Sequence, residues 1–328
     1  MSTSRIGFHA SHEQFAPGEL LRCARLAEQA GYAALSCSDH FHPWSAQQGQ
    51  SGHAWCWLGA ALASTALSAG VVTCPFGRYH PAVVAQACAT LAAMFPGRFW
   101  VAAGSGEALN EHITGRFWPS KAGRQQMLQE SVEVMRALWR GEEVDHDGAV
   151  RVDRARLYTL PERPPPVFAA ALTPQTARWA GGWADGLIMV SGPRDHMRAT
   201  IEAFHEGAGA ARPVYVQAKI AWAPPPGGER AAREMAFEQW RTNVLDSQAA
   251  AELATPAAFE ARAASVRPQD MDRAVRISAD LGRHAAWLAE DFELGAERVF
   301  IHNVGTNQQE ALAAFAAQVL PRIARAGA

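Results

Sequence analysis

The sequence predicts an α/β fold, a (β/α)8 TIM barrel with an insertion after its seventh strand. Short apolar runs, typical of buried strands, alternate with segments of helical spacing along all 328 residues. Eight such runs are present, and alternating β and α units imply a parallel sheet, which closes into a barrel at eight strands. The competitor, a six-stranded doubly wound fold, usually carries G-x-G-x-x-G after its first strand, where this chain has only Gly7 and Ala10.

Four strand–helix units are expected in the first half of the chain. Leu20, Leu21 and Ala24 show the helical spacing that Gly31 closes, and Pro96 stops a later helix. The expected strands are 6–9, 33–36, 67–72 and 99–103, and the expected helices are 19–29, about 57–66, 81–94 and 125–139.

The second half continues the alternation with two additions. Asp147-Gly148 lies between alternating residues in 143–158 and indicates a β-hairpin. An alanine-rich, weakly patterned stretch at about 223–270 reads as a helical insertion that covers one face of a single domain spanning 1–328. The remaining strands are expected at 167–171, 186–190, 214–222 and 298–302, and the helices at 174–181, 279–294 and 308–323.

Composition restricts the class of function. Hydrophobic residues make up 48% of the chain and charged residues 19%, as in a soluble globular enzyme. With a formal net charge of -2 and no Lys/Arg run, nucleic acid and anionic membranes are poor partners. Residues 1–5 lack the apolar region of a signal peptide and no run is long enough to span a membrane, so we expect a cytoplasmic protein. The five cysteines form no C-x-x-C pair and are expected to be reduced.

Candidate functional residues follow from the barrel itself, because its active site lies at the C-terminal ends of the strands. The stretch from Ser38 to Trp44 places an acid, two histidines and an indole after the second strand. The residues at these strand ends are His9 and Glu13, then Asp39, His40, His42 and Trp44, then Cys74, then Ser105, Gly106, Glu107 and Asn110, then Leu172 and Thr173, and finally His302 and Asn303.

Two chemistries fit these residues. His40-x-His42 could belong to a metal-dependent hydrolase, but such barrels need the histidine pair after the first strand and further ligands on later strands. The second chemistry is proton and hydride transfer against a bound cofactor. An imidazole with a reference pKa of ~6.5 suits a general acid or base, and Trp44 offers a flat wall for a conjugated ring.

Three motifs in order resemble the luciferase-like monooxygenase superfamily, in particular its branch of deazaflavin-dependent glucose-6-phosphate dehydrogenases. They are Ser38-Asp39-His40-Phe41-x-Pro43-Trp44, Arg78-Tyr79-His80-Pro81-Ala82-Val83-Val84-Ala85-Gln86 and Gly104-Ser105-Gly106-Glu107-Ala108-Leu109-Asn110-Glu111. The similarity runs from Ile6 to about Gly192 and resumes near Arg298. It implies the same barrel with an insertion after strand seven.

The resemblance also implies roles for individual residues. His40 would be the base that takes the substrate proton, Glu107 the acid near the cofactor ring, and Trp44 a wall of the site. Glu13 matches a position that lines the substrate side, and His9, at the end of the first strand, is also expected there. The residues expected to contact the cofactor are Asp39, Val71, Val72, Cys74, Ser105, Gly106, Asn110, Leu172 and Thr173, with a bulge and a non-prolyl cis peptide at Val71-Val72.

Departures from the branch change the expected ligands. Leu172-Thr173 replaces a Gly-Gly pair that takes the cofactor chain. Val190 and Pro193 replace a threonine and a lysine that hold the sugar phosphate, so glucose 6-phosphate is not expected as the substrate. We therefore expect FMN ahead of the deazaflavin coenzyme F420, an unidentified small organic substrate and a homodimer. A flavin-binding paralogue without catalysis is the remaining alternative.

Overall fold

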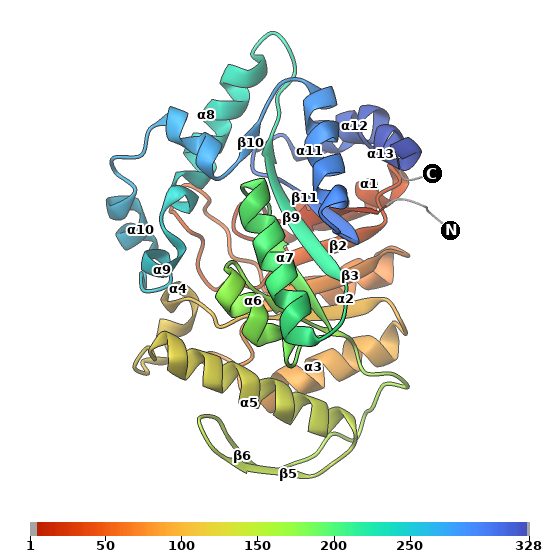
Figure 1. The fold of residues 1–328 in the computed structure, drawn as a ribbon, viewed down its shortest axis with the longest axis vertical. Coiled ribbons are helices and arrows are strands. Elements are labelled where there is room, and N and C mark those ends of the chain that lie inside the picture. The colour runs from red at the N-terminus through yellow and green to blue at the C-terminus, as the bar shows by residue number, and fades with distance from the viewer. Residues whose placement is uncertain (1–4, 327–328) are drawn as a thin grey trace.

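The computed structural model describes residues 5–326, and at its centre lies a closed barrel of parallel strands (Figure 1). Sequential strands pair side by side, and the pairing of β8 with β9 closes the ring. The eight barrel strands are β1 (Ile6–Ala10), β2 (Ala34–Ser38), β3 (Ser68–Thr73), β4 (Phe99–Ala103), β7 (Val167–Ala170), β8 (Gly186–Val190), β9 (Val214–Ala221) and β11 (Arg298–Asn303). The predicted barrel is therefore confirmed. The expectation about a signal peptide rests on the first residues of the chain, of which residues 1–4 lie outside the described part.

Helices surround this barrel, and two of them differ from the prediction. A helix not expected from the sequence, α7, follows β8 because Met197, Ile201 and Phe204 recur at helical spacing and are buried. The single terminal helix expected at 308–323 is interrupted before Pro321. The helices are α1 (Pro17–Gln29), α2 (Ala54–Ser64), α3 (Pro81–Met94), α4 (Ala108–Glu111) with η1 (His112–Thr114), α5 (Lys121–Trp139), α6 (Pro174–Gly181), α7 (Arg194–Ala208), α11 (Leu281–Glu293), α12 (Gln308–Gln318) and α13 (Leu320–Ala326).

Large aromatic side chains fill the N-terminal half of the barrel interior. Trp100, Phe168, Tyr215 and Phe300 project inward from β4, β7, β9 and β11 and pack ring against ring. Three of the strands between them, β1, β3 and β8, carry a glycine against one of these rings. A Cβ at Gly70 would lie 2.1 Å from the Trp100 ring, so this glycine makes room for the indole. The barrel is thus closed at its N-terminal end, and a ligand can enter only from the C-terminal end.

The next layer toward the C-terminal end is polar. His9 and Ser36 lie opposite each other on β1 and β2, and their side chains are 2.9 Å apart. His302 on β11 packs against His9 with ring centroids 4.5 Å apart and contacts Gln217 of β9 at 2.8 Å. Polar groups inside a barrel need partners or a ligand, so this layer marks the end at which chemistry takes place.

The predicted insertion lies between β9 and β10 and covers this end of the barrel. Its apolar side chains form a second core with Trp44, separate from the main one. Polar contacts fix it to the barrel loops: Ala46 N donates to Glu260 Oε1 at 2.8 Å, and Ala108 N donates to Ala251 O at 3.0 Å. Its elements are α8 (Gly228–Trp240), η2 (Arg241–Val244), α9 (Ser247–Ala250), α10 (Pro256–Arg262) and η3 (Pro268–Arg273), followed by β10 (Arg276–Ile277).

Three further sequence expectations can be compared with the structure. The hairpin is confirmed as β5 (Val144–Asp147) and β6 (Arg151–Ala155). The prediction of a bulge with a cis peptide at Val71-Val72 was wrong. β3 keeps regular register with both neighbouring strands, and the cis peptide found among the described residues is Pro225-Pro226. No helix within residues 5–326 is long and apolar enough to cross a membrane.

Candidate active site

The centre of the site is an ion pair between two loops that follow neighbouring strands. Glu13 comes after β1 and His40 after β2, and Glu13 Oε1 lies 2.8 Å from His40 Nδ1. Their side chains are only 2% and 12% exposed. Ser11 Oγ donates to the second carboxylate oxygen of Glu13 at 2.8 Å. The acid is therefore fixed in place, and it holds the imidazole so that Nε2 points away from the pair.

This pairing sets the charge of both groups. Burial by itself would lower the pKa of His40, but the negative charge of Glu13 and its direct contact outweigh burial and raise that pKa above 6.5. Burial would raise the pKa of Glu13, but His40 holds it well below its ordinary value. An imidazole with a raised pKa, oriented by a carboxylate, is the arrangement of a general base with its orienting acid.

Asp39, one residue before the base, has a different role because donors surround its carboxylate. Thr73 Oγ1 and Trp55 Nε1 donate to Oδ2 at 2.8 Å and 3.0 Å, and Arg78 Nη2 lies 3.0 Å from the same oxygen. Tyr79 OH donates to Oδ1 at 3.3 Å. The structure therefore makes Asp39 the anchor that fixes the loop after β2 to β3 and α2.

Arg78 was missed as a site residue, although it lies in one of the quoted motifs. Besides Asp39 it contacts Glu111 through Nη1 at 2.7 Å, and its backbone N donates to the same carboxyl at 2.7 Å. Burial raises the pKa of Glu111 to about 7 despite the opposing effect of Arg78. The guanidinium thus connects the loops after β2, β3 and β4 under the site.

Asn110 fixes the loop of His40 from the other side. Its Oδ1 accepts from Phe41 N at 2.9 Å and from His42 N at 3.3 Å, and its Nδ2 donates to Glu107 Oε2 at 3.3 Å. Glu107 is half-buried at the start of α4, and it raises the pKa of His40 as a third cause, after burial and Glu13. Asn110 therefore places the predicted base and acid relative to each other.

Free donors characterise the loop between β4 and α4. The backbone N–H groups of Ser105, Gly106 and Glu107, and the Ser105 hydroxyl, make no hydrogen bond within residues 5–326. Gly106 has φ +68, and a Cβ there would lie 2.9 Å from Cys74 Sγ. Cys74 itself is buried, bonds to Phe76 O at 3.3 Å and has a pKa raised well above its ordinary value by burial, so it is an unreactive thiol.

Trp44 lies beside the base and beneath the insertion. Its ring centroid is 5.0 Å from that of His40, edge to face, and 5.2 Å from that of Phe259 in α10. The predicted wall residue thus separates the base from the insertion. Val72 and Val71, both expected at the cofactor, lie on opposite faces of β3: Val72 packs toward the barrel interior, whereas Val71 is buried in the main core.

The polar layer below contains a lysine that sequence reasoning missed. Lys219 of β9 donates to Asn243 Oδ1 of the insertion at 2.6 Å, and burial lowers its pKa to about 8. A lysine at an inward position of an otherwise apolar strand was the available signal. His9, expected on the substrate side, lies in the same layer, and burial lowers its pKa to about 3, which keeps it neutral.

Leu172 and Thr173 lie between β7 and α6, at the same end of the barrel. Leu172 is 48% exposed, unusual for a large apolar residue. Thr173 caps α6 and accepts from Thr176 N at 3.3 Å. His40 and His42, the pair considered for a metal, contact different elements, since His42 Nδ1 lies 2.9 Å from Leu109 O. Within residues 5–326 no group of three or more potential metal ligands is assembled.

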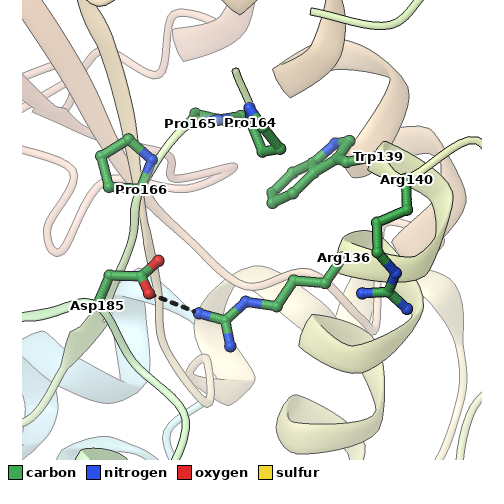
Figure 2. A pocket seen from close by; sticks show the side chains of 7 residues that line it. All are labelled: Arg136, Trp139, Arg140, Pro164, Pro165, Pro166 and Asp185. Atoms are coloured by element: carbon green, nitrogen blue, oxygen red, sulfur yellow. Dashed lines mark hydrogen bonds and ion pairs between the residues drawn. The ribbon is translucent and has the colours of Figure 1, made fainter. Parts of the chain in front are cut away.

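A large open cavity lies elsewhere. It has a volume of about 400 Å³ and is lined by Arg136, Trp139, Arg140, Pro164, Pro165, Pro166 and Asp185 (Figure 2). The prolines precede β7 and Asp185 precedes β8, so the cavity is at the N-terminal end of the barrel. Arg136 is already paired with Asp185 at 3.0 Å. Barrel enzymes use the opposite end, where the Glu13–His40 pair lies, and we place the active site there.

Comparison with known proteins decides the family. A family model described as luciferase-like monooxygenase matches residues 1–298. The chain belongs to the luciferase-like monooxygenase family. Two relatives of this luciferase-like protein are F420-dependent glucose-6-phosphate dehydrogenases, each 34% identical. The one from Beutenbergia cavernae is matched over 97% of both chains, and the one from Mycobacterium avium over 100% of both.

Solved structures agree with this assignment. The luciferase-like chain is similar to an F420-dependent secondary alcohol dehydrogenase in complex with an F420-acetone adduct, with a TM-score of 0.90 and 31% identity over 98% of this chain and 99% of that one. The oxygenating constituent of 3,6-diketocamphane monooxygenase from Pseudomonas putida, in complex with FMN, has a TM-score of 0.70 at 14% identity over 98% and 99%, a likeness that shows the fold alone. The resemblance inferred from the three motifs is therefore confirmed, and the relatives are oxidoreductases.

Proposed function

We propose that this protein transfers a hydride between the carbon of a small secondary alcohol and coenzyme F420, in place of the FMN that the sequence favoured. The Glu13–His40 pair carries the proposal, because it supplies an oriented base with one ring nitrogen free to meet a hydroxyl group. Relatives at 31% and 34% identity, named for F420, support the choice of cofactor.

The donor set at the barrel mouth fits a flat ring with several acceptor atoms. The free N–H groups of Ser105, Gly106 and Glu107 suit ring carbonyls, and glycine at 106 lets the backbone approach closely. Val72 offers an apolar contact from β3. When bound, F420 supplies the ring carbon that takes or gives the hydride.

His40 and Glu13 move and stabilise the proton. As the alcohol is oxidised, His40 Nε2 takes the hydroxyl proton, and Glu13 at 2.8 Å stabilises the imidazolium that results. In the reverse direction the imidazolium returns this proton to the carbonyl oxygen. Glu107, whose carboxylate accepts one hydrogen bond of 3.3 Å from Asn110 Nδ2, is the acidic group placed to pass a proton on the cofactor side of the site.

The surroundings favour a small, uncharged alcohol over a sugar phosphate. Arg273 and Arg276 are the arginines near the end of the insertion that could hold a phosphate group, and Arg276 is committed to a bidentate ion pair with Asp291 at 2.6 Å and 2.8 Å. Arg273 is largely exposed beside Asp270. On the side of the insertion, Trp44 meets the apolar ring of Phe259.

Binding and turnover test the proposal separately. Purified protein is titrated with F420 and with FMN and followed by absorbance, and F420-dependent oxidation of propan-2-ol and of glucose 6-phosphate is then measured. We expect F420 to bind more tightly than FMN and propan-2-ol alone to be oxidised. Tighter binding of FMN would overturn the cofactor assignment. Binding without turnover of any secondary alcohol would favour a non-catalytic flavin-binding paralogue.

We also propose that the protein is a homodimer, joined through the helices that follow β2 and β3. The family resemblance supports this, and the exposed apolar residues Val83 and Met94 lie on α3. Sedimentation equilibrium gives the mass directly. A monomer at micromolar concentration would refute the proposal.

A further inference from the structure

Lys219 is an unusual cation in this chain, and the function proposed above gives it no part. Only two of the 30 lysine and arginine residues are lysines, Lys121 and Lys219. Lys121 is exposed at the start of α5, whereas Lys219 lies on β9, a strand of the barrel. A lysine ammonium is a compact point donor, and the guanidinium of arginine is a wide planar fork. The lysine inside the barrel therefore suits a narrow site that holds a single oxygen atom.

The side chain of Lys219 opens into the barrel mouth. Along β9, Val216, Ala218 and Ile220 are buried in the main core, whereas Tyr215 packs against the aromatic rings inside the barrel. Lys219 shares the face of Tyr215, because alternate residues of a strand point to the same side. Part of the Lys219 side chain is accessible. Since the aromatic rings close the N-terminal end of the barrel, this accessible part faces the mouth.

The ammonium group has donors to spare. Nζ donates to Asn243 Oδ1 at 2.6 Å and lies 5.3 Å from the centroid of the Trp240 ring. It forms no ion pair with a carboxylate among residues 5–326. An ammonium carries three N–H donors, so the hydrogen bond to Asn243 leaves two of them. A largely buried cation with unused donors is costly unless a ligand supplies acceptors.

Lys219 lies on the same side of the mouth as the central ion pair. After burial, the charge of Glu13 is the influence on the pKa of Lys219, and it raises that pKa. Lys219 in turn acts on two neutral histidines of the polar layer, since it adds to the effect of burial in lowering the pKa of His9 and of His302. Glu13 touches His40 at 2.8 Å, so the same acid links the base with the lysine.

We propose that Lys219 donates to a second, neutral oxygen of the substrate, so that the preferred substrate is a secondary alcohol with an ether, hydroxyl or carbonyl oxygen close to the reacting carbon. This inference rests on the proposed function, in which the reacting hydroxyl group meets His40 Nε2. A neutral oxygen fits better than a carboxylate, because Glu13 is the charged group that acts on Lys219 and would repel a second anion.

Two pairs of alcohols of matched shape test this contact. We match 1-methoxypropan-2-ol with pentan-2-ol and 4-methoxybutan-2-ol with hexan-2-ol, so that each pair differs by an ether oxygen in place of a methylene group. In at least one pair, kcat/KM for F420-dependent oxidation should favour the ether at least about tenfold, as expected for a hydrogen bond from a charged donor. In Lys219→Met, which keeps most of the apolar stem without the donors, this ratio should fall to about one. A ratio near one in both pairs for the unsubstituted enzyme overturns the proposal.

Two control variants separate substrate binding from a structural role. Asn243→Ala removes the acceptor that ties Lys219 to the insertion but keeps the ammonium, so the ratio should stay high. The exposed Lys121→Met should leave the ratio unchanged. A ratio that falls equally in Asn243→Ala and Lys219→Met would instead make Lys219 a tie between barrel and insertion, and would overturn the proposal.

The pH dependence of the same ratio gives a further readout. Burial lowers the pKa of Lys219 to about 8, and a neutral amine is a weaker donor than an ammonium. The preference for the ether should therefore decline as pH rises above about 8. Glu13 and His40 act on both alcohols of a pair alike, and His9 and His302 stay neutral over this range. A ratio that stays constant from pH 7 to pH 9.5 would contradict a contact with the ammonium.

Nuclear magnetic resonance distinguishes failure of this inference from failure of the proposed function. Protein with ¹³C at Cε of lysine gives two lysine signals, and Lys121→Met assigns the remaining one to Lys219. Methoxyacetone or 4-methoxybutan-2-one, the ketones of the ethers, should raise the pKa of Lys219 by about 1, whereas pentan-2-one and hexan-2-one should not. An equal response to ethers and hydrocarbons overturns the assignment of Lys219. The expected response without oxidation of any alcohol would support it and refute the hydride transfer.

Discussion

Replacing Glu13 by glutamine tests the central pair most directly. Glutamine keeps the shape and an acceptor oxygen 2.8 Å from His40 Nδ1 but removes the charge. Burial, the largest influence on His40, then acts unopposed by Glu13 and lowers its pKa. For alcohol oxidation His40 must be neutral, so the rise of kcat/KM with pH should move to lower pH in Glu13→Gln. The plateau should fall because a weaker base remains.

The same substitution should also lower the free energy of unfolding, by an amount that depends on pH. Glu13 has a lowered pKa, so its contribution is present above its unfolded value of 4.5 and is lost as pH falls. His40 has a raised pKa, so its contribution is present below 6.5 and is lost as pH rises through the raised value. The pair therefore stabilises the fold most between about pH 4.5 and pH 6.5. At pH 5.5 we expect Glu13→Gln to lower the free energy of unfolding by ~3 kcal/mol, the lower end for a broken buried pair, since the imidazole can release its proton.

Urea unfolding at pH 5.5 and pH 8.5 and the pH profile of kcat/KM are the two measurements. The loss of stability should be clearly smaller at pH 8.5, where His40 carries less charge. Serine at position 11 offers a matched control, since Ser11→Ala removes a hydrogen bond to Glu13 but keeps its charge. Equal losses at both pH values, or a pH profile that moves to higher pH, would refute the reasoning about the pair.

Three other substitutions probe separate parts of the site. His40→Ala should lower kcat by ~10²–10⁴-fold with F420 still bound, as measured by steady-state kinetics and fluorescence titration; unchanged turnover would remove His40 as the base. Asp39→Asn removes one of the two carboxylates that Arg78 contacts and leaves Glu111 as the other, so it should destabilise the protein by ~1–3 kcal/mol in urea unfolding, whereas a near-neutral result would show that Asp39 is no anchor. Gly106→Ala places a side chain at φ +68 and 2.9 Å from Cys74 Sγ; it should cost ~1–3 kcal/mol in thermal unfolding and weaken F420 binding, and normal values for both would argue against a close approach of the ring.

The barrel was predictable because each strand is a short apolar run, and glycine and proline residues mark where many of the elements begin or end. The strand-end rule then selected His40, Glu107 and Trp44 without knowledge of any contact. The missed helix α7 had a readable signal, since Met197 and Ile201 are four residues apart and Gly192-Pro193 before them marks a helix start. Local pattern therefore accounts for most of the fold.

The contacts within the site were not predictable in the same way. Glu13 and His40 are 27 positions apart, and only the register of β1 on β2 and the course of two irregular loops bring them within 2.8 Å. Asp39 was expected at the cofactor from the family resemblance, and no sequence pattern indicated that its partners Thr73 and Arg78 come from β3 and the loop beyond it. Loops have no periodicity from which such pairings can be read.

Asp39, Glu13 and Glu107 all lie at the barrel mouth, but their hydrogen-bond partners show that they have different roles. Asp39 accepts from several donors, and Glu13 is held by His40 and Ser11, so neither carboxylate has much capacity left for a ligand. Glu107 has one hydrogen bond of 3.3 Å, to Asn110, and is half-buried. A partly buried carboxylate with unused acceptor capacity is costly unless a ligand completes it. Of the three, Glu107 is therefore the acid that the fold leaves available to a bound cofactor.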